Sequence, residues 1–504
     1  MSLSATPTPR LGSAVVSSEL STAQQRAVAE LFRVAPVADD LGRRFARAGH
    51  ELHLVGGSVR DALLGRLGAD LDFATDAKPD AVLAIAAGWA ESVWTTGIDF
   101  GTVGMARRGF RLEVTTYRAD RYDRVSRNPT VTYGSSLDDD LRRRDFAVNA
   151  MAISVPDHRW SDPYGGLTDL LERRLRTPGA AADSFADDPL RMLRTARFVS
   201  TLGFVPAPDV LAATREMAVS IARITAERVQ AELSKLLLGN QPRAGLALLV
   251  ETGLADYVLP ELPALRMEID EHHQHKDVYA HSLIVLEQAI SLEADGPDLV
   301  LRLAAILHDI GKPATRRHEP DGGVSFHHHE VVGAKLARRR LRELRYPREV
   351  VDDVAQLVLL HLRFHGFGRG EWTDSAVRRY VTDAGDLLPR LHKLVRSDCT
   401  TRNRARAEEL RRNYAELERR IAVLREREEL DRIRPDLDGN QIMELLAIAP
   451  GPDVGAAYKH LLAVRMDRGP LPHVEVVAEL RRWAAEQGVG RQRGDAATGD
   501  GPAR

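Results

Sequence analysis

Apolar and polar residues alternate most clearly in two stretches near the N-terminus. In DLDF (70–73), Leu71 and Phe73 are apolar, whereas Asp70 and Asp72 are charged. Alternate side chains of a strand share a face, so this pattern predicts a strand with one buried face and one face that carries two carboxylates. The segment RLEVTTY (111–117) alternates in the same way and predicts a further strand, with another expected at 102–105.

Most of the remaining pattern has a helical period. Helices are expected at 23–49 and 80–90, then in an amphipathic segment from Leu190 to Phe198, in AERVQAELSKLLL (226–238) and in the charged segment 401–434. Strands are therefore expected only near the N-terminus. The predicted fold class is α+β: a small N-terminal head with a mixed or antiparallel sheet, followed by an elongated all-α region.

Composition limits the protein class. A chain of 504 residues is long enough for three or four domains. Its single cysteine, Cys399, excludes a disulfide framework and favours a cytoplasmic location. With 70 basic and 72 acidic residues, a nucleic-acid surface would have to be local. Residues 1–20 carry no apolar run suited to a signal peptide, and no stretch approaches the roughly 18 apolar residues of a membrane span.

The chemistry concentrates in LVGGSVRDALLGRLGADLD (54–72). A strand ends at Val55, Gly56 and Gly57 allow close backbone approach, and Ser58 is a plausible N-cap of the next helix. A helix N-terminus attracts phosphate, and two carboxylates on one strand face suit Mg²⁺. The stretch therefore predicts a site for Mg²⁺ and a triphosphate, in preference to an ordinary strand–turn–helix with two solvated aspartates.

Further charged residues could extend this site. Glu113 faces the same way as Arg111 and could be a third carboxylate, although a surface glutamate explains it equally well. The polar segment 119–140 predicts a mobile loop over the site. After it, Arg142, Arg143 and Arg144 open an apolar helix with Asp145, so the arginines could face a triphosphate or ribose rather than solvent.

A second cluster of metal-binding residue types lies at 271–400. His281, His308-Asp309, His329, His361 and Asp398 all fall within or beside helical patterns. Mixed imidazole and carboxylate ligands suit Mn²⁺, Fe²⁺, Ni²⁺ or Mg²⁺ better than a structural zinc. A lone histidine of this kind would usually be structural, but the whole set resembles an HD phosphohydrolase domain. His281, His308, Asp309 and Asp398 match its minimal metal set, and His329 and His361 match positions that support a second metal.

Taken together, the motifs resemble the class II tRNA nucleotidyltransferase/poly(A) polymerase family, whose bacterial members include the CCA-adding enzymes. The matching elements run in order over about 30–480: GGSVRD (56–61), DLD (70–72), FGTV with LEVTTYR (100–118), RRD (143–145), DPYGG…DL (162–170) and DDPLRMLRTARF (187–198). The resemblance implies metal-binding catalytic carboxylates at Asp70 and Asp72, to which we add Glu113. The expected nucleotide-binding residues are Gly56, Gly57, Arg60, Arg144, Asp145, Asp188, Arg191, Arg194 and Arg197.

The resemblance also implies that Asp188 and Arg191 act as a protein template for the incoming base. Alone, Asp188-Pro189 could simply be an N-cap followed by a first-turn proline. Cytosine and adenine each present an amino donor beside a ring acceptor, which suits one carboxylate and one guanidinium. Uracil and guanine reverse that pattern and would be rejected by several kcal/mol. The family usually has Glu where this chain has Asp187, which leaves the two template residues intact.

These inferences divide the chain into six parts. They are a disordered segment (1–22), the catalytic nucleotidyltransferase head (23–155), a helical neck with the base template (156–270), an HD domain (271–400), a helical body and tail that binds tRNA (401–487) and a disordered tail (488–504).

The sequence predicts a CCA-adding tRNA nucleotidyltransferase that adds C, C and A from CTP and ATP, with Mg²⁺ at the head and Mg²⁺ or a transition metal at the HD site. Its expected partner is tRNA, with no membrane and no obligate protein partner. One alternative is a poly(A) polymerase or a terminal-A-only enzyme. Bacterial poly(A) polymerases usually carry a basic G-R/K-R/K-F element downstream of the aspartates, where this chain has TGIDFGTVGMARRGF (96–110). A further alternative is an HD phosphohydrolase whose head only binds nucleotide or RNA.

Overall fold

The computed structural model describes residues 20–66, 68–118, 134, 136–271, 274–320, 323–363, 372–399, 404–428 and 433–490. Most of the predicted loop 119–140 and of the two predicted disordered ends lies outside these residues. The chain forms two compact units, Met1–Pro260 and Glu261–Arg504, and each is described by itself.

Two helices open the first unit where the sequence predicted one. α1 (Thr22–Val34) carries a capping box from Ser21, and α2 (Pro36–Arg47) begins at a proline. Proline at 36 disfavours a helical conformation at Ala35, whose φ and ψ are −114° and 61°. The prediction of a single helix at 23–49 was therefore wrong. Proline at 36 divides this segment into α1 and α2, and the apolar positions assigned to one helix are shared between the two.

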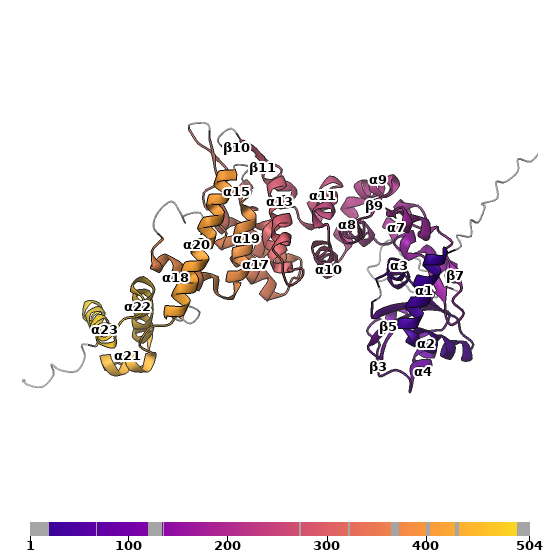
Figure 1. Cartoon of the computed structure of the whole chain (residues 1–504), viewed down its shortest axis with the longest axis horizontal. Helices are drawn as coiled ribbons and strands as arrows, with labels where there is room; N and C mark the ends of the chain where they lie inside the picture. The colour runs from indigo at the N-terminus through magenta and orange to yellow at the C-terminus, as the bar shows by residue number, and fades with distance from the viewer. Residues whose placement is uncertain are drawn as a thin grey trace, which may run out of the picture. The chain divides into compact units, whose positions relative to one another are not determined.

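A seven-stranded sheet follows, in the order β3-β4-β5-β2-β1-β6-β7. Its strands are β1 (Leu52–Val55), β2 (Asp70–Thr75), β3 (Ser92–Trp94), β4 (Thr102–Arg107), β5 (Phe110–Thr116), β6 (Ala152–Ser154) and β7 (Trp160–Ser161). β2 and β5 run parallel and the other pairs are antiparallel, so the sheet is mixed, as predicted. Figure 1 shows α2 and α4 (Pro79–Ala86) against this sheet.

The two faces of the sheet differ as the alternation predicted. Leu71, Phe73, Leu112 and Val114 are buried, while Asp70 and Asp72 are exposed. The last part of the predicted 119–140 loop is instead helical, because Ser136 caps α5 (Leu137–Arg142) by accepting from the Asp139 N–H.

The rest of the first unit is mainly helical. α3 (Gly57–Leu63) lies between β1 and β2, and α6 (Gly166–Leu171) follows the sheet. α8 (Leu190–Leu202) packs against α10 (Ala226–Leu237) and α11 (Pro242–Glu251). α7 (Ala181–Asp187), α9 (Pro208–Met217) and α12 (Ala255–Val258) complete the helices, and β8 (Arg174–Leu175) pairs with β9 (Val205–Pro206).

The second unit begins with a helical core. α13 (Val278–Ser291), α14 (Leu299–Leu307), α17 (Arg348–Leu360) and α19 (Leu388–Asp398) pack together, and α16 (His329–Glu343) lies along α17. The hairpin β10 (Glu268–Glu271)–β11 (Gln274–Asp277), the short helix α15 (Lys312–Thr315) and the pair β12 (Arg317–His318)–β13 (Val324–Ser325) flank it.

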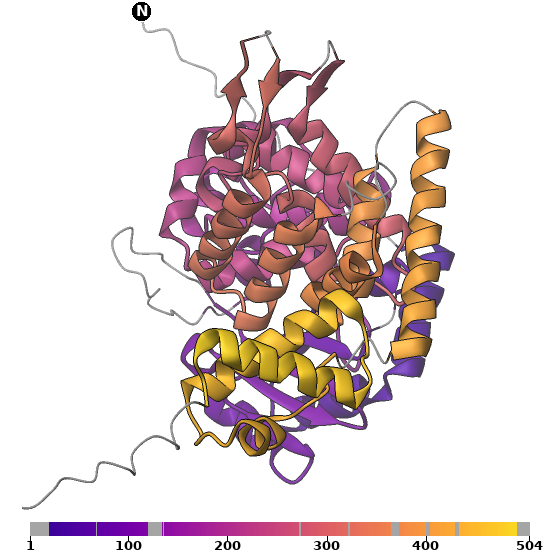
Figure 2. The ribbon, with the colours of Figure 1, turned by 90° about the vertical axis from the view of Figure 1, so that its left-hand side faces the viewer.

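The C-terminal part of this unit is also helical. α18 (Asp374–Ala384) contacts α20 (Arg404–Glu428), the long orange helix of Figure 2. α21 (Gly439–Leu446), α22 (Pro452–Arg468) and α23 (His473–Gln487), yellow in Figure 2, share a small apolar core around Leu461 and Leu480. Among the described residues, no helix has the combined length and apolarity needed to cross a bilayer.

Candidate active site and histidine cluster

The turn between β1 and α3 is shaped by glycine. Gly56 has φ +71°, and a methyl group added there would lie 2.8 Å from Arg144 Nη1. The positive φ therefore requires glycine, and a Cβ there would also displace the Arg144 guanidinium. Gly56 is also the N-cap of α3, so the predicted N-cap at Ser58 was wrong. The Ser58 hydroxyl instead accepts from the Asp72 N–H (3.0 Å) and donates to the Asp70 carbonyl (3.3 Å), which fixes α3 against β2.

Three carboxylates gather on the open face of the sheet. Asp70 and Asp72 alternate with buried residues along β2, and the parallel pairing with β5 places Glu113 directly opposite Asp72. Neighbouring strands lie about 4.8 Å apart, so these side chains are neighbours. Arg111 donates to Glu113 over 3.3 Å. The structure thus brings together the three residues that were predicted as catalytic, while their roles stay predictions.

The electrostatics of this group suit a cation. Although Asp72 is exposed at the surface, the protein atoms around it reduce its hydration and so raise its pKa. The positive charge of Arg144 lowers this pKa, whereas the negative charges of Glu113 and Asp70 raise it further. A carboxylate whose negative charge is disfavoured in this way gains from a bound divalent ion. The donor set, three carboxylates with oxygen ligands only, matches the preference of Mg²⁺.

A buried aspartate that the sequence interpretation missed holds the arginines of the RRD motif. Asp140, fully buried on α5, accepts from Arg143 (2.8 Å) and Arg144 (3.0 Å). Burial alone would raise the pKa of Asp140, but Arg144 and Arg143 outweigh it and hold the pKa below its ordinary value. Asp140 lies three residues before Arg143 and four before Arg144, the spacing at which side chains of one helix meet. The sequence could have identified Asp140 as their partner if 137–140 had been predicted as helical.

Asp145 connects the head to the neck helices. Its carboxylate accepts from the Phe146 N–H, from Asn149 (2.8 Å each) and from Arg194 Nε (2.7 Å). Burial would raise the pKa of Asp145, yet Arg194 and Asn149 hold it well below its usual range. Asp145 is therefore ionised, and its carboxylate oxygens are engaged in hydrogen bonds with other groups of the protein.

Glu232, another residue that sequence reasoning missed, completes this network. It is 4% exposed and lies 3.3 Å from Arg194 and 3.2 Å from Arg197. Arg60 is also buried: it donates to Asp61 through two nitrogens and to Asn149 (2.6 Å). Arg60, Arg194 and Arg197, three of the arginines predicted to bind nucleotide, are therefore held by acidic or amide side chains of the same unit.

The two predicted template residues have different surroundings. Asp188 accepts from the Leu190 N–H (3.1 Å) and pairs with Arg228 (2.7 Å). The N-cap position of α8 is Pro189, so the alternative of an N-cap at Asp188 with proline at the first helical position was wrong, although Asp188 does bind a backbone N–H of the first turn. Arg191 is 9% exposed and donates to the Ser184 hydroxyl (2.8 Å) and to the Arg143 carbonyl. Both residues lie where the neck meets the RRD segment of the head.

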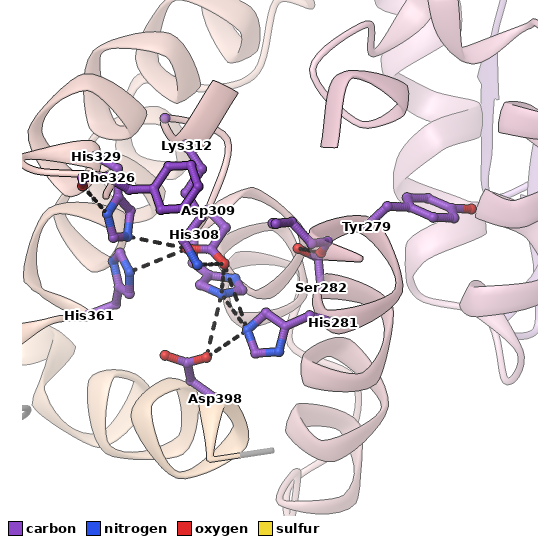
Figure 3. Close-up of polar contacts among 12 residues, drawn as sticks. Tyr279, His281, Ser282, His308, Asp309, Lys312, Phe326, His329, His361 and Asp398 are labelled. Atoms are coloured by element: carbon purple, nitrogen blue, oxygen red, sulfur yellow. Dashed lines mark hydrogen bonds and ion pairs between the residues drawn. The ribbon is translucent and has the colours of Figure 1, made fainter. Parts of the chain in front are cut away.

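The second unit assembles all six predicted HD residues, as Figure 3 shows. Asp309 lies at the centre: its Oδ2 is 3.2 Å from His308 Nε2 and its Oδ1 is 3.3 Å from His329 Nε2. His281 lies 2.9 Å from Asp398 and 3.3 Å from His308, and His361 lies 3.9 Å from Asp309. Two groups could each hold a metal, His281 with His308 and Asp309, and Asp309 with His329 and His361.

Three of these histidines are oriented in the same way. The Nδ1 atoms of His308, His329 and His361 each face a backbone carbonyl three residues earlier, at 2.8, 2.9 and 2.6 Å. Donation by Nδ1 leaves Nε2 as a ligand atom directed at Asp309. The Nε2 atoms of His329 and His361 are buried without a hydrogen-bond partner among the described residues.

The charge state of the cluster also favours a cation. Burial, with His308 nearby, lowers the pKa of His361 to about 3, so this imidazole is neutral and able to ligate. Burial would lower the pKa of His308, but Asp309 and Asp398 raise it to about 9. A proton on His308 thus offsets the carboxylates, and metal binding would release it.

Three family models match the chain in order. They are the Poly A polymerase head domain (52–176), the Probable RNA and SrmB- binding site of polymerase A (203–265) and the HD domain (278–390).

Similar curated proteins differ in the nucleotides that their names specify. An A-adding tRNA nucleotidyltransferase of Deinococcus radiodurans is 34% identical over 445 residues, covering 86% of this chain and 95% of the relative. A CC-adding tRNA nucleotidyltransferase of Thermus thermophilus is 34% identical over 460 residues, covering 89% and 96%. A CCA-adding enzyme of Anoxybacillus flavithermus is 33% identical over 349 residues, covering 69% and 75%.

Solved structures match along nearly the whole chain. A Bacillus stearothermophilus CCA-adding enzyme in complex with CTP has a TM-score of 0.62 and 26% identity, covering 93% of this chain and 99% of that one. A Thermotoga maritima CCA-adding enzyme complexed with tRNA has a TM-score of 0.57 and 15% identity, covering 91% and 98%, and supports the fold alone.

Replacing Asp140 by Asn should destabilise the protein in a pH-dependent way. At pH 7 the change leaves two guanidinium groups without their buried counter-charge, so we expect the free energy of unfolding to fall by about 3 kcal/mol. The pKa of Asp140 is lowered by folding, so its contribution is complete above the unfolded pKa and is lost as the pH falls through the folded value. The difference between variant and parent should therefore narrow below about pH 4. Urea unfolding of the full chain at several pH values measures this difference in stability. Asp139→Asn, at the exposed neighbouring position, is the control. An equal loss at every pH would contradict the assignment.

Proposed function

The chain belongs to the tRNA nucleotidyltransferase and poly(A) polymerase family, and from this premise we propose that it adds C, C and A to the 3′ end of tRNA without a nucleic-acid template. Nucleotidyl transfer by the head is common to this proposal and to the poly(A) polymerase and terminal-A-only alternatives, but not to an HD phosphohydrolase whose head only binds nucleotide or RNA. The observation that carries the proposal is the group of three carboxylates beside the Gly56–Gly57 turn and Arg144. It combines a cation site with a cradle for a triphosphate.

Each residue of the head has a distinct task in this proposal. Asp70 and Asp72, with Glu113 beside them, would hold Mg²⁺, which when bound activates the RNA 3′-hydroxyl and neutralises the charge of the triphosphate. The Gly56–Gly57 backbone would let the phosphates approach closely. Arg144, held by its ion pair with Asp140, would face these phosphates. Ser58 fixes the spacing between the phosphate turn and the carboxylate strand.

Asp188 and Arg191 would select the base. A carboxylate acceptor and a guanidinium donor match the amino group and ring nitrogen of cytosine or adenine. Arg191 is held by Ser184 and by the Arg143 carbonyl, so its donor direction is fixed. Asp188 pairs with the half-exposed Arg228, a partner that the amino group of a base can replace. Arg194 pairs with Asp145 and Arg197 pairs with Glu232. In this proposal their positive charges favour the bound nucleotide at longer range, without direct contact.

The substrates follow from the relatives. Solved structures of CCA-adding enzymes include complexes with CTP, with ATP and with tRNA, and we extend these three substrates to this chain. The C-terminal helices α20–α23 are the part that we assign to the outer tRNA, whose shape more than its sequence is recognised. Cytoplasmic tRNA is the natural substrate pool for this reaction, and the single cysteine agrees with that compartment.

The second unit supports a second proposed activity, metal-dependent hydrolysis of a phosphate ester. The observation that favours it is the pair of buried Nε2 atoms, on His329 and His361, directed at a carboxylate that already faces His308. A transition metal such as Mn²⁺, Fe²⁺ or Ni²⁺, or Mg²⁺, would fit these mixed ligands.

The nucleotides that are added test the first proposal. Purified enzyme should receive a tRNA that lacks its CCA end, with each nucleoside triphosphate singly and then CTP with ATP. We expect two residues from CTP alone and three from CTP with ATP. A single A on a tRNA that already ends in CC, with no use of CTP, would identify an A-adding enzyme. A long A tract on unrelated RNA would identify a poly(A) polymerase.

Removal of a carboxylate tests the proposed chemistry in the same assay. Asp72→Asn should reduce the rate of addition by roughly a thousandfold, equivalent to about 4 kcal/mol of transition-state stabilisation. Asp99→Asn, an exposed head aspartate outside the site, is the matched control. Near-parental addition by Asp72→Asn would refute the site.

The template assignment predicts a change of base preference. Asp188→Arg combined with Arg191→Asp reverses the donor and acceptor, so C and A incorporation should fall relative to U and G. The measurement is the ratio of kcat/KM among the four nucleotides, because a purely structural defect lowers all four together. An unchanged preference for C and A would reduce the two residues to a helix cap and its neighbour.

The histidine cluster should be separable from the head. His308→Ala with Asp309→Ala should abolish high-affinity Mn²⁺ or Ni²⁺ binding in calorimetry and any metal-dependent phosphate-ester hydrolysis, and spare nucleotide addition. His318→Ala, an exposed histidine of the same unit, is the control. If the parent binds no divalent metal beyond that of the head, the domain is an inherited scaffold.

A further inference from the structure

A groove of about 600 Å³ in the first unit shares Arg60 and Arg197 with the site described above, and the rest of its lining lies outside that site. It lies between the C-terminal end of α3 with the loop that leads to β2, on one side, and α8 and α10, on the other. Its charged and aromatic lining consists of Arg60, Asp61, Arg66, Arg197, Phe198 and Lys235.

The groove carries an excess of positive charge. Arg60 and Asp61 neutralise each other through a bidentate pair, and Arg197 shares Glu232 with Arg194. Arg66 and Lys235 are exposed, and neither has a carboxylate partner among the residues that the structure describes. Two uncompensated cations at the rim of one concave surface attract an anion more strongly than scattered surface charges do.

Beneath the two rim cations, arginines surround the aromatic ring of Phe198. Three guanidinium groups approach the ring of Phe198, from Arg197 (4.3 Å), Arg60 (5.3 Å) and Arg194 (5.5 Å). Burial and the charge of Arg194 lower the pKa of Arg197 to about 10, which leaves it protonated at pH 7. Asp61, Asp145 and Glu232 pair with these three arginines, so the excess positive charge of the groove comes from Arg66 and Lys235.

The position of the groove identifies which anion. Gly68, part of its lining, is two residues before Asp70, so the groove ends beside the carboxylate strand. The triphosphate cradle lies at the opposite end of α3, at Gly56 and Gly57. Nucleotidyl transfer has two anionic substrates, and the second one must reach the carboxylates with its 3′-hydroxyl.

We propose that this groove binds the phosphates of the acceptor RNA strand immediately upstream of its 3′ end, through Arg66 and Lys235. The proposal rests on the proposed function and adds the path of the RNA to it. The contacts are to phosphates and therefore independent of base, as expected where the same enzyme must accept an end that grows by one nucleotide at a time.

Substitution of the two rim cations tests the proposal. Arg66→Gln with Lys235→Gln should raise the KM for tRNA lacking CCA about tenfold and leave kcat at saturating tRNA and the KM for CTP unchanged. Each lost phosphate contact should also reduce the slope of log Kd for tRNA against log salt by roughly 0.7–0.9. Lys78→Gln with Arg159→Gln, two exposed cations of the same unit outside the groove, is the matched control.

Each outcome decides the question. A higher KM for CTP with unchanged tRNA affinity would make the groove a triphosphate site and overturn the proposal, as would a variant that behaves like the control. A tRNA whose phosphates next to the 3′ end are replaced by uncharged methylphosphonates should lose most of the difference between variant and parent, and an undiminished difference would place the contact elsewhere on the RNA. Direct tRNA binding needs no nucleotide addition, so it tests the groove even if the parent fails to add C, C and A.

Discussion

Arginine held by a buried carboxylate is the interaction on which the predicted nucleotide-binding side of the first unit depends. Asp140 holds Arg144 above Gly56, Asp145 holds Arg194, and Glu232 is shared by Arg194 and Arg197. Such pairs contribute little net stability, because the loss of hydration offsets most of their attraction. Removing one partner is nevertheless strongly unfavourable, since the other charge is left buried. The main effect of the network is therefore to fix the orientation of each guanidinium group. A flexible, solvated arginine would adopt many orientations.

The two predicted metal-binding clusters differ from this network, because their carboxylates outnumber the fixed cations beside them: Arg111 pairs with Glu113 alone, and Lys312 pairs with Asp309. On the sheet, Asp70, Asp72 and Glu113 are neighbours, and the pKa of Asp72 is raised by the loss of water and by the other two carboxylates. In the second unit, a proton on His308 offsets Asp309 and Asp398. Both clusters are held in place by backbone, through strand pairing in one and through Nδ1–carbonyl contacts in the other. Rigid ligands with incomplete charge balance are what a cation site requires before the cation arrives.

The sequence predicted these sites unevenly, and the reasons are physical. Period-two alternation was enough to place Asp70 and Asp72 on one exposed face, because a strand has only two faces. Glu113 stayed ambiguous, since its distance from Asp72 depends on the register of β5 against β2, which no local pattern contains. Asp140 and Glu232 were missed because each acts through an arginine on another element or turn. Ser58 was misassigned because serine caps helices and also bridges backbone groups, and only the tertiary position of β2 decides between the two. The six predicted HD residues do lie together, because four histidines and two aspartates in a recognisable order carry more information than any single one, while their role as metal ligands stays a prediction.

The asymmetry of Asp188 and Arg191 bears on how base selection would work. Arg191 is buried and fixed by two protein acceptors, so a base with a ring N–H at that place meets a donor that cannot turn away. Asp188 has one oxygen on the Leu190 N–H and the other on Arg228, whose side chain is 50% exposed. An exposed ion pair is worth at most about 1 kcal/mol, so an incoming amino group can replace Arg228 at little cost. If these residues read the base, rejection of uracil and guanine comes mainly from the rigid guanidinium, and acceptance of both cytosine and adenine comes from the exchangeable carboxylate. A template of one fixed and one exchangeable group can then accept two bases of different size without a change in its hydrogen-bond pattern.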